Sequence, residues 1–433
     1  MFRRDAAGNL PLFLLQVVFS LTIIPDVTVR ADDKEPAGGL SVAKPDSPEK
    51  IPRPAPVEPV PPEELEASIR RGIDYLLESQ NPNGSWGSAT QTKGLNIYAP
   101  IPGAHEAFRA AVTSLCISAL IETKDPRPEV DAAIDRAEVW LYSHLSEVRR
   151  ATGDAIYNVW CHGYAIQALV RLDVRPGGSS DRHVRIKAFI DEQFDKLDRY
   201  ASIDGGWGYY DFRYQAKQPS SSSISFVNAA VLVAFDEARR AGFAPPEKVV
   251  QKAIDATNRQ RLPDMSYLYG EYLKWQPRRG INRPGGSLGR TQACNVALRM
   301  WGDETVTDQV LVDWLDRLFA RNGWLDVGRK RPIPHEWWFQ VAGYFYYFGH
   351  YYAAYAIEML PPEKRAGYQA HMARTLLPKQ EKDGSWWDYP LYDYHQPYGT
   401  AFALMTLQRC RAASSQSPGT PATPVSPEKK AVP

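Results

Sequence analysis

The phrase Gln80-Asn-Pro-Asn-Gly84-Ser-Trp86 returns 300 residues later as Gln380-Glu-Lys-Asp-Gly384-Ser-Trp386. Each copy follows an amphipathic segment and is suited to ending a helix. Glycine adopts the left-handed conformation that stops a helix, glutamine can bond the free backbone groups at a helix end, and tryptophan can cover the turn. Degenerate copies occur at Gly205-Gly206-Trp207-Gly208 and Gly323-Trp324. The recurrence indicates that one structural unit is repeated along the chain.

The body of the chain alternates between two kinds of helical pattern. Six amphipathic segments carry apolar residues at helical spacing, as in Val310, Trp314 and Leu318, and they predict outer helices. Six other segments are apolar nearly all round, so they must be covered on both sides and predict inner helices. The outer helices are expected near 64–80, 131–148, 183–200, 247–261, 304–321 and 363–381, and the inner helices near 108–122, 158–172, 224–240, 290–301, 340–360 and 397–411.

Six two-layer helix pairs can close head to tail into a ring, with the apolar helices on the inside. Closure removes the bare ends that an open helical repeat must cap. No segment shows sustained alternation with a period of two between hairpin turns, which argues against a sheet. We therefore expect an all-α fold, an α6/α6 toroid in a single domain. A bundle of unrelated helices is the alternative, but it does not explain the repeated alternation.

The repeated phrase and the helix alternation, over about residues 64–411, resemble the prenyltransferase and squalene oxidase repeat of squalene and oxidosqualene cyclases and of protein prenyltransferase β subunits. The resemblance implies an α/α toroid with a funnel-shaped cavity at its axis. It does not imply one activity, because function depends on the residues placed on the repeats. The Asp-x-Asp-Asp motif with which class II terpene cyclases of this group protonate their substrate is absent, and the body contains no Asp-Asp-x-x-Asp cluster to hold magnesium.

The ends of the chain differ from the body in composition. Arg3 and Arg4 precede an apolar run from Leu10 to Ile24, and small residues at Val29 and Ala31 suit cleavage of a signal peptide. The run is shorter than the roughly 20 apolar residues of a membrane span, so we expect an exported protein, periplasmic or extracellular, with no stable span after cleavage. A retained anchor is the alternative. The expected division is a signal peptide at 1–31, a disordered Pro-rich linker at 32–62, the toroid at 63–412 and a disordered Pro/Ser/Thr-rich tail at 413–433.

Charge and cysteine content narrow the function classes. Lysine and arginine total 51 against 50 aspartates and glutamates, so nothing indicates binding to nucleic acid or to an anionic membrane surface. The four cysteines have no C-x-x-C spacing and lie in apolar helical patterns, which predicts buried thiols. Tyrosine, phenylalanine and tryptophan number 23, 15 and 12, more than a core alone requires. Binding partners must therefore be sought in local sites.

Two late segments carry the candidate polar site. The segment from Gly328 to Phe339 is similar to the part of prenyltransferase β subunits where Gly-Arg and a later Lys bind diphosphate and Asp-x-Cys binds zinc, and the segment from Asp393 to Tyr398 is similar to the part that carries the zinc-binding His. The resemblance implies that two arginines bind an anion and that a His and an Asp bind zinc or act as an acid/base pair. Asp-x-Cys is missing here, and ordinary helix-capping and loop roles are the alternative. The candidates are Arg329 and Arg331 for the anion, and Asp393 and His395, with His335 or Glu336, for zinc or catalysis.

The candidate cavity wall is aromatic. Eleven of the 19 residues from 337 to 355 are aromatic, and Tyr344 and Tyr351 lie on one helical stripe. We expect these two residues and Tyr398 to line the wall, where rings can enclose a polyisoprenoid chain or stack on sugars. His162 and His350 lie in inner helices, either as satisfied core groups or as cavity ligands.

Three functions fit this sequence. The first is a pocket of the prenyltransferase and cyclase kind for a small apolar, isoprenoid or lipid-like ligand, with or without catalysis; an enzyme of this kind would be a transferase or a cyclase. The second is a polysaccharide lyase or hydrolase on a similar toroid, with Tyr or His as base and aromatic rings for stacking. The third is a non-catalytic toroid that binds a lipid or a protein through its funnel.

Overall fold

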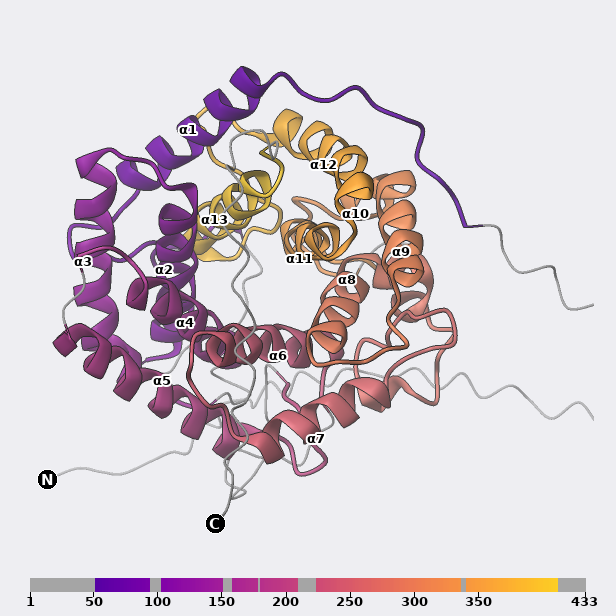
Figure 1. Ribbon diagram of the computed structural model, residues 1–433, viewed down its shortest axis with the longest axis horizontal. Helices are drawn as coiled ribbons and strands as arrows, with labels where there is room; N and C mark the ends of the chain where they lie inside the picture. The colour runs from indigo at the N-terminus through magenta and orange to yellow at the C-terminus, as the bar shows by residue number, and fades with distance from the viewer. Residues whose placement is uncertain are drawn as a thin grey trace, which may run out of the picture. The chain divides into compact units, whose positions relative to one another are not determined.

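The computed structural model describes residues 51–93, 103–150, 158–177, 180–208, 223–335 and 340–411. Within these ranges the chain forms thirteen α-helices and no β-strand. The helices form two concentric layers around a common axis (Figure 1). The predicted all-α toroid is confirmed.

The inner layer is a closed ring of six helices. Each inner helix packs against the next, and the last packs against the first, which closes the ring. The inner helices are α2 (Ala104–Thr123), α4 (Asn158–Asp173), α6 (Ser225–Arg240), α8 (Pro284–Met300), α11 (Phe345–Met359) and α13 (His395–Gln408).

The outer layer covers the inner one, since each outer helix packs against the inner helix that precedes it around the ring: α3 on α2, α5 on α4, α7 on α6, α9 on α8, α12 on α11, and α1 on α13. The outer helices are α1 (Pro62–Glu78), α3 (Pro128–His144), α5 (Ser180–Tyr200), α7 (Glu247–Asn258), α9 (Asp308–Ala320) and α12 (Pro362–Leu376). The connections contain the short helix α10 (Asn322–Asp326) and the 3₁₀ turns η1 (Leu145–Glu147), η2 (Glu271–Leu273), η3 (Gly280–Asn282), η4 (Leu377–Lys379) and η5 (Tyr392–Tyr394).

Side-chain burial separates the two layers as the sequence patterns predict. Fifteen of the 20 residues of α2 are buried, against six of the 21 residues of α5. By length and composition α2 is the one helix in the described part of the chain that could cross a membrane, but 78% of that apolar window is buried within the ring. A core helix of a soluble protein passes the same test, so α2 is weak evidence for a span.

The repeated phrase forms the same turn at both ends of the chain. The side-chain amide of Gln80 donates to Gly84 O at 2.9 Å, and the indole N–H of Trp86 reaches back to Leu76 O at 2.7 Å. Gln380 and Trp386 make the matching bonds in the last pair, at 2.9 and 3.0 Å. The tryptophan therefore bonds the end of the preceding helix, whereas the glutamine bonds the carbonyl of the turn glycine instead of a free group at the helix end.

These turns also join neighbouring outer helices. Gln80 Nε2 donates to Ala133 O of α3 at 2.9 Å, and Gln380 Nε2 donates to Ser68 O of α1 at the same distance. The first turn therefore connects the end of α1 to the next outer helix, α3. The last turn connects the end of the last outer helix to α1, the first one. A further copy lies at 261–267, where Arg261 takes the place of the glutamine and Met265 takes the left-handed position with φ 63°. The sequence did not reveal this copy, because Met and Tyr replace the glycine and tryptophan of the phrase.

The inner helices α8 and α11 begin farthest from the predicted residues. Helix α8 begins at Pro284 instead of residue 290, because proline suits the first helical turn, where its missing N–H costs no bond. Helix α11 begins at Phe345 instead of residue 340, because Gln340 is left-handed with φ 52° and the carboxylate of Asp388 accepts the N–H of Tyr347 in the first turn. Residues 340–344 therefore lie in the connection before α11 and not inside the helix.

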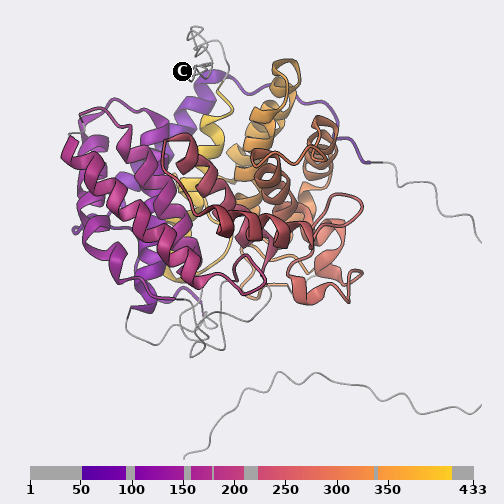
Figure 2. The same cartoon turned by 60° about the horizontal axis from the view of Figure 1, so that its bottom comes forward.

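The described part of the predicted linker packs on the ring. Residues 51–61 form no helix, but Arg374 of α12 donates to Glu58 O and Pro59 O at 2.9 and 3.1 Å, so this segment does not lie free. Figure 2 shows it running from α1 along α12 and α9. Residues 1–31, 32–50 and 413–433 lie outside the described residues. All four cysteines are buried and free, as predicted.

Candidate functional site

The ring encloses an aromatic cavity of about 800 Å³, counting its open mouth. Ten of its fifteen lining residues are aromatic and three are aliphatic, which leaves Asp388 and His395 as the ionisable groups besides the tyrosines. We call it the aromatic cavity. Its lining is Phe108, Ala111, Val112, Trp160, Tyr164, Phe226, Tyr344, Phe345, Phe348, Asp388, Tyr389, Leu391, Tyr394, His395 and Tyr398.

The lining comes from the N-terminal halves of five inner helices, α2, α4, α6, α11 and α13, and from the loop before α13. Tyr344 and Tyr398 lie in this wall, where the sequence analysis placed them. Trp160 and Phe226 were not singled out there. Their signal was an aromatic residue in the first or second turn of an apolar helix, but that signal does not by itself distinguish the wall from the core.

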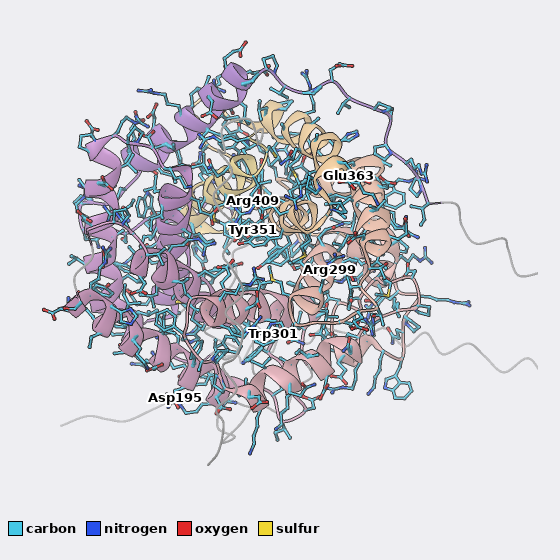
Figure 3. The ribbon with its side chains drawn as sticks, viewed as in Figure 1. Asp195, Arg299, Trp301, Tyr351, Glu363 and Arg409 are labelled. Atoms are coloured by element: carbon cyan, nitrogen blue, oxygen red, sulfur yellow. The ribbon has the colours of Figure 1, made fainter. Side chains whose placement is uncertain are left out.

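A cluster of charges occupies the opposite ends of the same inner helices. Arg171 of α4 contacts Glu122 of α2 at 2.6 Å and Glu237 of α6 at 2.7 Å. Arg409 follows α13 and contacts Glu122 at 2.5 Å and Glu358 at 3.2 Å. Figure 3 shows Arg409 inside the ring and Asp195 at its outer edge. We give the name ionic cluster to the five residues Glu122, Arg171, Glu237, Glu358 and Arg409. The ionic cluster joins the ends of α2, α4, α6, α11 and α13 that lie away from the aromatic cavity.

Asp388 is the acidic residue of the cavity, and sequence reasoning missed it as well. It follows Trp386-Trp387 in the loop before α13 and is 1% exposed. Burial raises its pKa to about 7, although the N–H of Tyr347 and the charge of Arg329 favour the carboxylate. A carboxyl group with such a pKa, on an aromatic wall, can act as a general acid near neutral pH. The available signal was an acidic residue directly after the tryptophans of the turn phrase.

The Asp388→Asn variant is expected to be more stable than the wild type at pH 8, by on the order of 3 kcal/mol, and about equally stable near pH 4. The folded protein holds the proton of Asp388 up to about pH 7, whereas the unfolded chain releases it near pH 4. Between these values the folded state binds more protons, so wild-type stability falls as the pH rises. Asparagine keeps the site neutral throughout.

Urea unfolding at pH 4, 6 and 8 measures this difference. The matched control is Asp195→Asn, whose carboxylate is 63% exposed and should give a small, pH-independent difference. A pH-independent difference for Asp388→Asn as well would show that Asp388 ionises normally in the folded protein.

His395 and Asp393 do not share a site. The Nδ1–H of His395 donates to Tyr392 O at 2.7 Å, which leaves Nε2 as the acceptor of the ring in the cavity wall. Burial lowers the pKa of His395, so its neutral form is favoured. Asp393 is exposed and accepts a hydrogen bond from Ser88 at 3.1 Å. Among the described residues no three His, Cys, Asp or Glu side chains come together to hold a metal ion; Glu336 lies outside the described residues.

His335 lies in a second cavity, which we call the vestibule and which has about 820 Å³ of space with its mouth. The ring of His335 is fixed, because Nδ1 donates to Gln340 O at 2.6 Å and Nε2 accepts the hydroxyl of Tyr344 at 3.0 Å. Tyr344 and Tyr389 belong to both cavities, so the two share a wall. The lining of the vestibule is Tyr269, Tyr272, Leu273, Arg279, Ile281, Pro334, His335, Gln340, Tyr344 and Tyr389.

The two arginines predicted to bind an anion line neither cavity. Arg329 donates to Asp326 at 2.7 Å and lies over the ring of Tyr346, with its guanidinium carbon 5.7 Å from the ring centre. Arg329 is thus already paired with the carboxylate of Asp326, three residues before it. Arg331 is exposed.

Three further candidates are core residues. His162 and His350 are fully buried, and their Nδ1 atoms bond Gln193 Oε1 at 2.8 Å and Tyr346 O at 2.6 Å. Burial lowers the pKa of both to about 4, so they are neutral at pH 7. Tyr351 lies at the ionic cluster, where its hydroxyl meets that of Tyr355 at 3.1 Å. It stands almost two helical turns beyond Tyr344, too deep along the axis for the aromatic cavity.

Comparisons with known proteins identify the fold and no family. No family model and no curated protein match the sequence. Among solved structures, the GH76A α-1,6-mannanase of Salegentibacter sp. HEL1_6 matches with a TM-score of 0.51 and 10% identity, over 80% of this chain and 98% of the mannanase. The type II terpene cyclase MstE from Scytonema matches with a TM-score of 0.47 and 16% identity, over 81% of this chain and 99% of the cyclase. The chain is an all-α toroid, and membership of the repeat family remains a prediction.

Proposed function

We propose that the aromatic cavity binds an isoprenoid or lipid-like chain. The observation that carries this proposal is the lining, in which thirteen of fifteen residues are aromatic or aliphatic. Burial of an apolar chain against such a wall removes apolar surface from water, which favours binding. The faces of the aromatic rings can also stabilise a cation. The ionic cluster lies at the opposite ends of the same inner helices, so we expect the chain to enter at the end where the aromatic cavity lies.

The cavity also offers one acid and one base. Asp388, with a pKa near 7, can donate a proton to a double bond of the ligand, and His395 Nε2 can accept a proton from the resulting cation. This pair would catalyse an isomerisation or a cyclisation without net loss of protons. Asp388 thus takes the place beside His395 for which the sequence suggested Asp393.

Hydrolysis of a glycoside by two carboxyl groups fits this cavity less well. Glycoside hydrolysis uses two carboxyl groups, and Asp388 is the single Asp or Glu among the described lining residues. A mannanase variant with two consecutive aspartates replaced is inactive. This chain has no two consecutive aspartates between residues 51 and 411.

Trp160→Ala is expected to weaken the binding of geranylgeraniol about tenfold, because it removes one ring of the wall. Trp324→Ala is the matched control, since its indole lies on α10 beside Arg321 and outside the cavity. Isothermal titration with geranylgeraniol, and separately with an α-1,6-mannotetraose, measures both affinities.

The proposal fails if the mannotetraose binds and geranylgeraniol does not, or if both variants bind geranylgeraniol as the wild type does. Mass spectrometry of geranylgeraniol recovered after incubation then separates the two roles. A rearranged product that disappears in Asp388→Asn identifies an enzyme, and unchanged alcohol identifies a binding protein. Export of the protein, predicted from residues 1–31, is part of the same proposal.

A further inference from the structure

The aromatic cavity and the vestibule share a wall but differ in chemistry. The vestibule holds a cation at Arg279, an amide at Gln340, an imidazole at His335 and the phenols of Tyr269 and Tyr272. The aromatic cavity is apolar over most of its wall. Since Tyr344 and Tyr389 line both, the two cavities lie next to each other.

The surroundings of the vestibule are positively charged. Arg279 belongs to a short segment with Lys274, Arg278 and Arg283, and its own bond to Gln276 Oε1 is long, at 3.3 Å. Glu271, the acidic residue of this segment, is held by Arg259 at 2.7 Å. No Asp or Glu occurs among the described residues that line the vestibule. An anion placed there would meet cations and hydrogen-bond donors.

The polar wall of the vestibule is held in place before any ligand arrives. Gln340 Oε1 accepts the N–H of Ile281 at 3.3 Å, so the amide nitrogen is the group that this side chain can offer a ligand. Gln340 and His335 both have left-handed backbones, with φ 52° and 61°. Residues other than glycine rarely adopt this conformation, and where they do it often marks a ligand site.

We propose that the vestibule binds the anionic oxygen head group of an amphiphile whose apolar chain occupies the aromatic cavity. Arg279 makes the charge-assisted contact, and Gln340 and the tyrosine hydroxyls complete the head-group site. The head is a carboxylate or a phosphate, which share this chemistry. The inference rests on the proposed function, because it places the chain in the aromatic cavity.

Isothermal titration at pH 8 with dodecanoate, dodecyl phosphate and dodecanol tests the head-group site. The two anions are expected to bind the wild type more tightly than the alcohol does. Arg279→Gln should weaken the better of the two anions about fivefold, a modest factor because the side chain is exposed, and leave dodecanol unchanged. Arg278→Gln is the matched control, because it removes the same charge from a neighbouring residue that does not line the vestibule.

Equal affinities of the wild type for anions and alcohol would overturn the proposal, as would an equal loss in Arg278→Gln, which would show only a general effect of charge. Dodecanol reports on the chain site independently. If it binds and Trp160→Ala weakens it, the proposed function stands even when the head-group site fails. If dodecanol does not bind, the proposed function fails first. The ratio between dodecanoate and dodecyl phosphate identifies the head.

Discussion

Arg171→Met is expected to lower the free energy of unfolding by about 3–5 kcal/mol, because it leaves two buried carboxylates without their shared partner. Arg171 contacts Glu122 and Glu237 from the neighbouring inner helices, and the exposed fractions of the three side chains are only 13%, 16% and 13%. Methionine fills a similar volume, so the loss measures the charges more than a cavity. Arg409 still reaches Glu122 but not Glu237, whose remaining partner is the hydroxyl of Tyr355 at 2.5 Å.

Guanidinium-induced unfolding at pH 7 measures the effect. Arg199→Met is the matched control, because Arg199 and Asp195 form a pair with exposed fractions of 58% and 63%, and its loss should cost less than about 1 kcal/mol. Equal costs in the two variants would mean that water reaches the ionic cluster freely.

The contribution of the ionic cluster depends on pH with a definite sign. Burial opposes ionisation of Glu122, but Arg409 and Arg171 outweigh it and hold its pKa below the ordinary value. A depressed folded-state pKa gives stability that is present above the unfolded value, near pH 4.3, and is lost as the pH falls through the folded value. The difference between wild type and Arg171→Met should therefore shrink in acid.

Gly384→Ala is expected to cost about 2–4 kcal/mol, because the alanine would meet two obstacles at once. Gly384 has φ 88°, and a Cβ atom there would lie 2.4 Å from the backbone oxygen of Arg71 in α1. The turn would have to move away from α1, which would strain the bond from Gln380 to Ser68 O at the seam of the ring.

Gly242→Ala separates these two obstacles. The φ of Gly242, 93°, is nearly the same, but nothing lies within 4 Å of the added Cβ. This variant should therefore lose only about 1 kcal/mol of stability, the cost of a left-handed backbone at alanine. Thermal and urea unfolding measure the loss of stability in both variants. The difference between the two losses is the cost of the clash between the last turn and α1. If the two losses are equal, the close approach of α1 and the last turn does not contribute.

The fold could be predicted because its signals are local and repeated. In each turn phrase the glutamine donates to the glycine carbonyl four residues on and the tryptophan donates to a helix carbonyl ten residues back, and each inner helix is apolar on nearly every side. Both signals can be recognised in one helix pair without reference to the other five. Helix starts were less well predicted, because the first turn of α11 is held by Asp388, more than forty residues later.

The site was predicted only in part, because depth along the axis is a property of the closed ring. Tyr344 and Tyr351 share a stripe on α11, yet one lines the aromatic cavity and the other meets the ionic cluster. The cluster draws Glu122, Arg171 and Glu237 from three separate pairs, and no local pattern reveals that they meet. The pKa of Asp388 likewise follows from burial that the distant helices create.

The closure of α13 against α2 has a consequence for synthesis on the ribosome. Helix α2 is complete early in translation, but the surface that will cover its α13-facing side is made only in the last part of the chain. Until then the nascent protein carries a bare apolar flank that invites chaperones and aggregation. A premature stop anywhere before residue 395 would make that exposure permanent, so truncated products should be cleared rather than accumulate as partial rings.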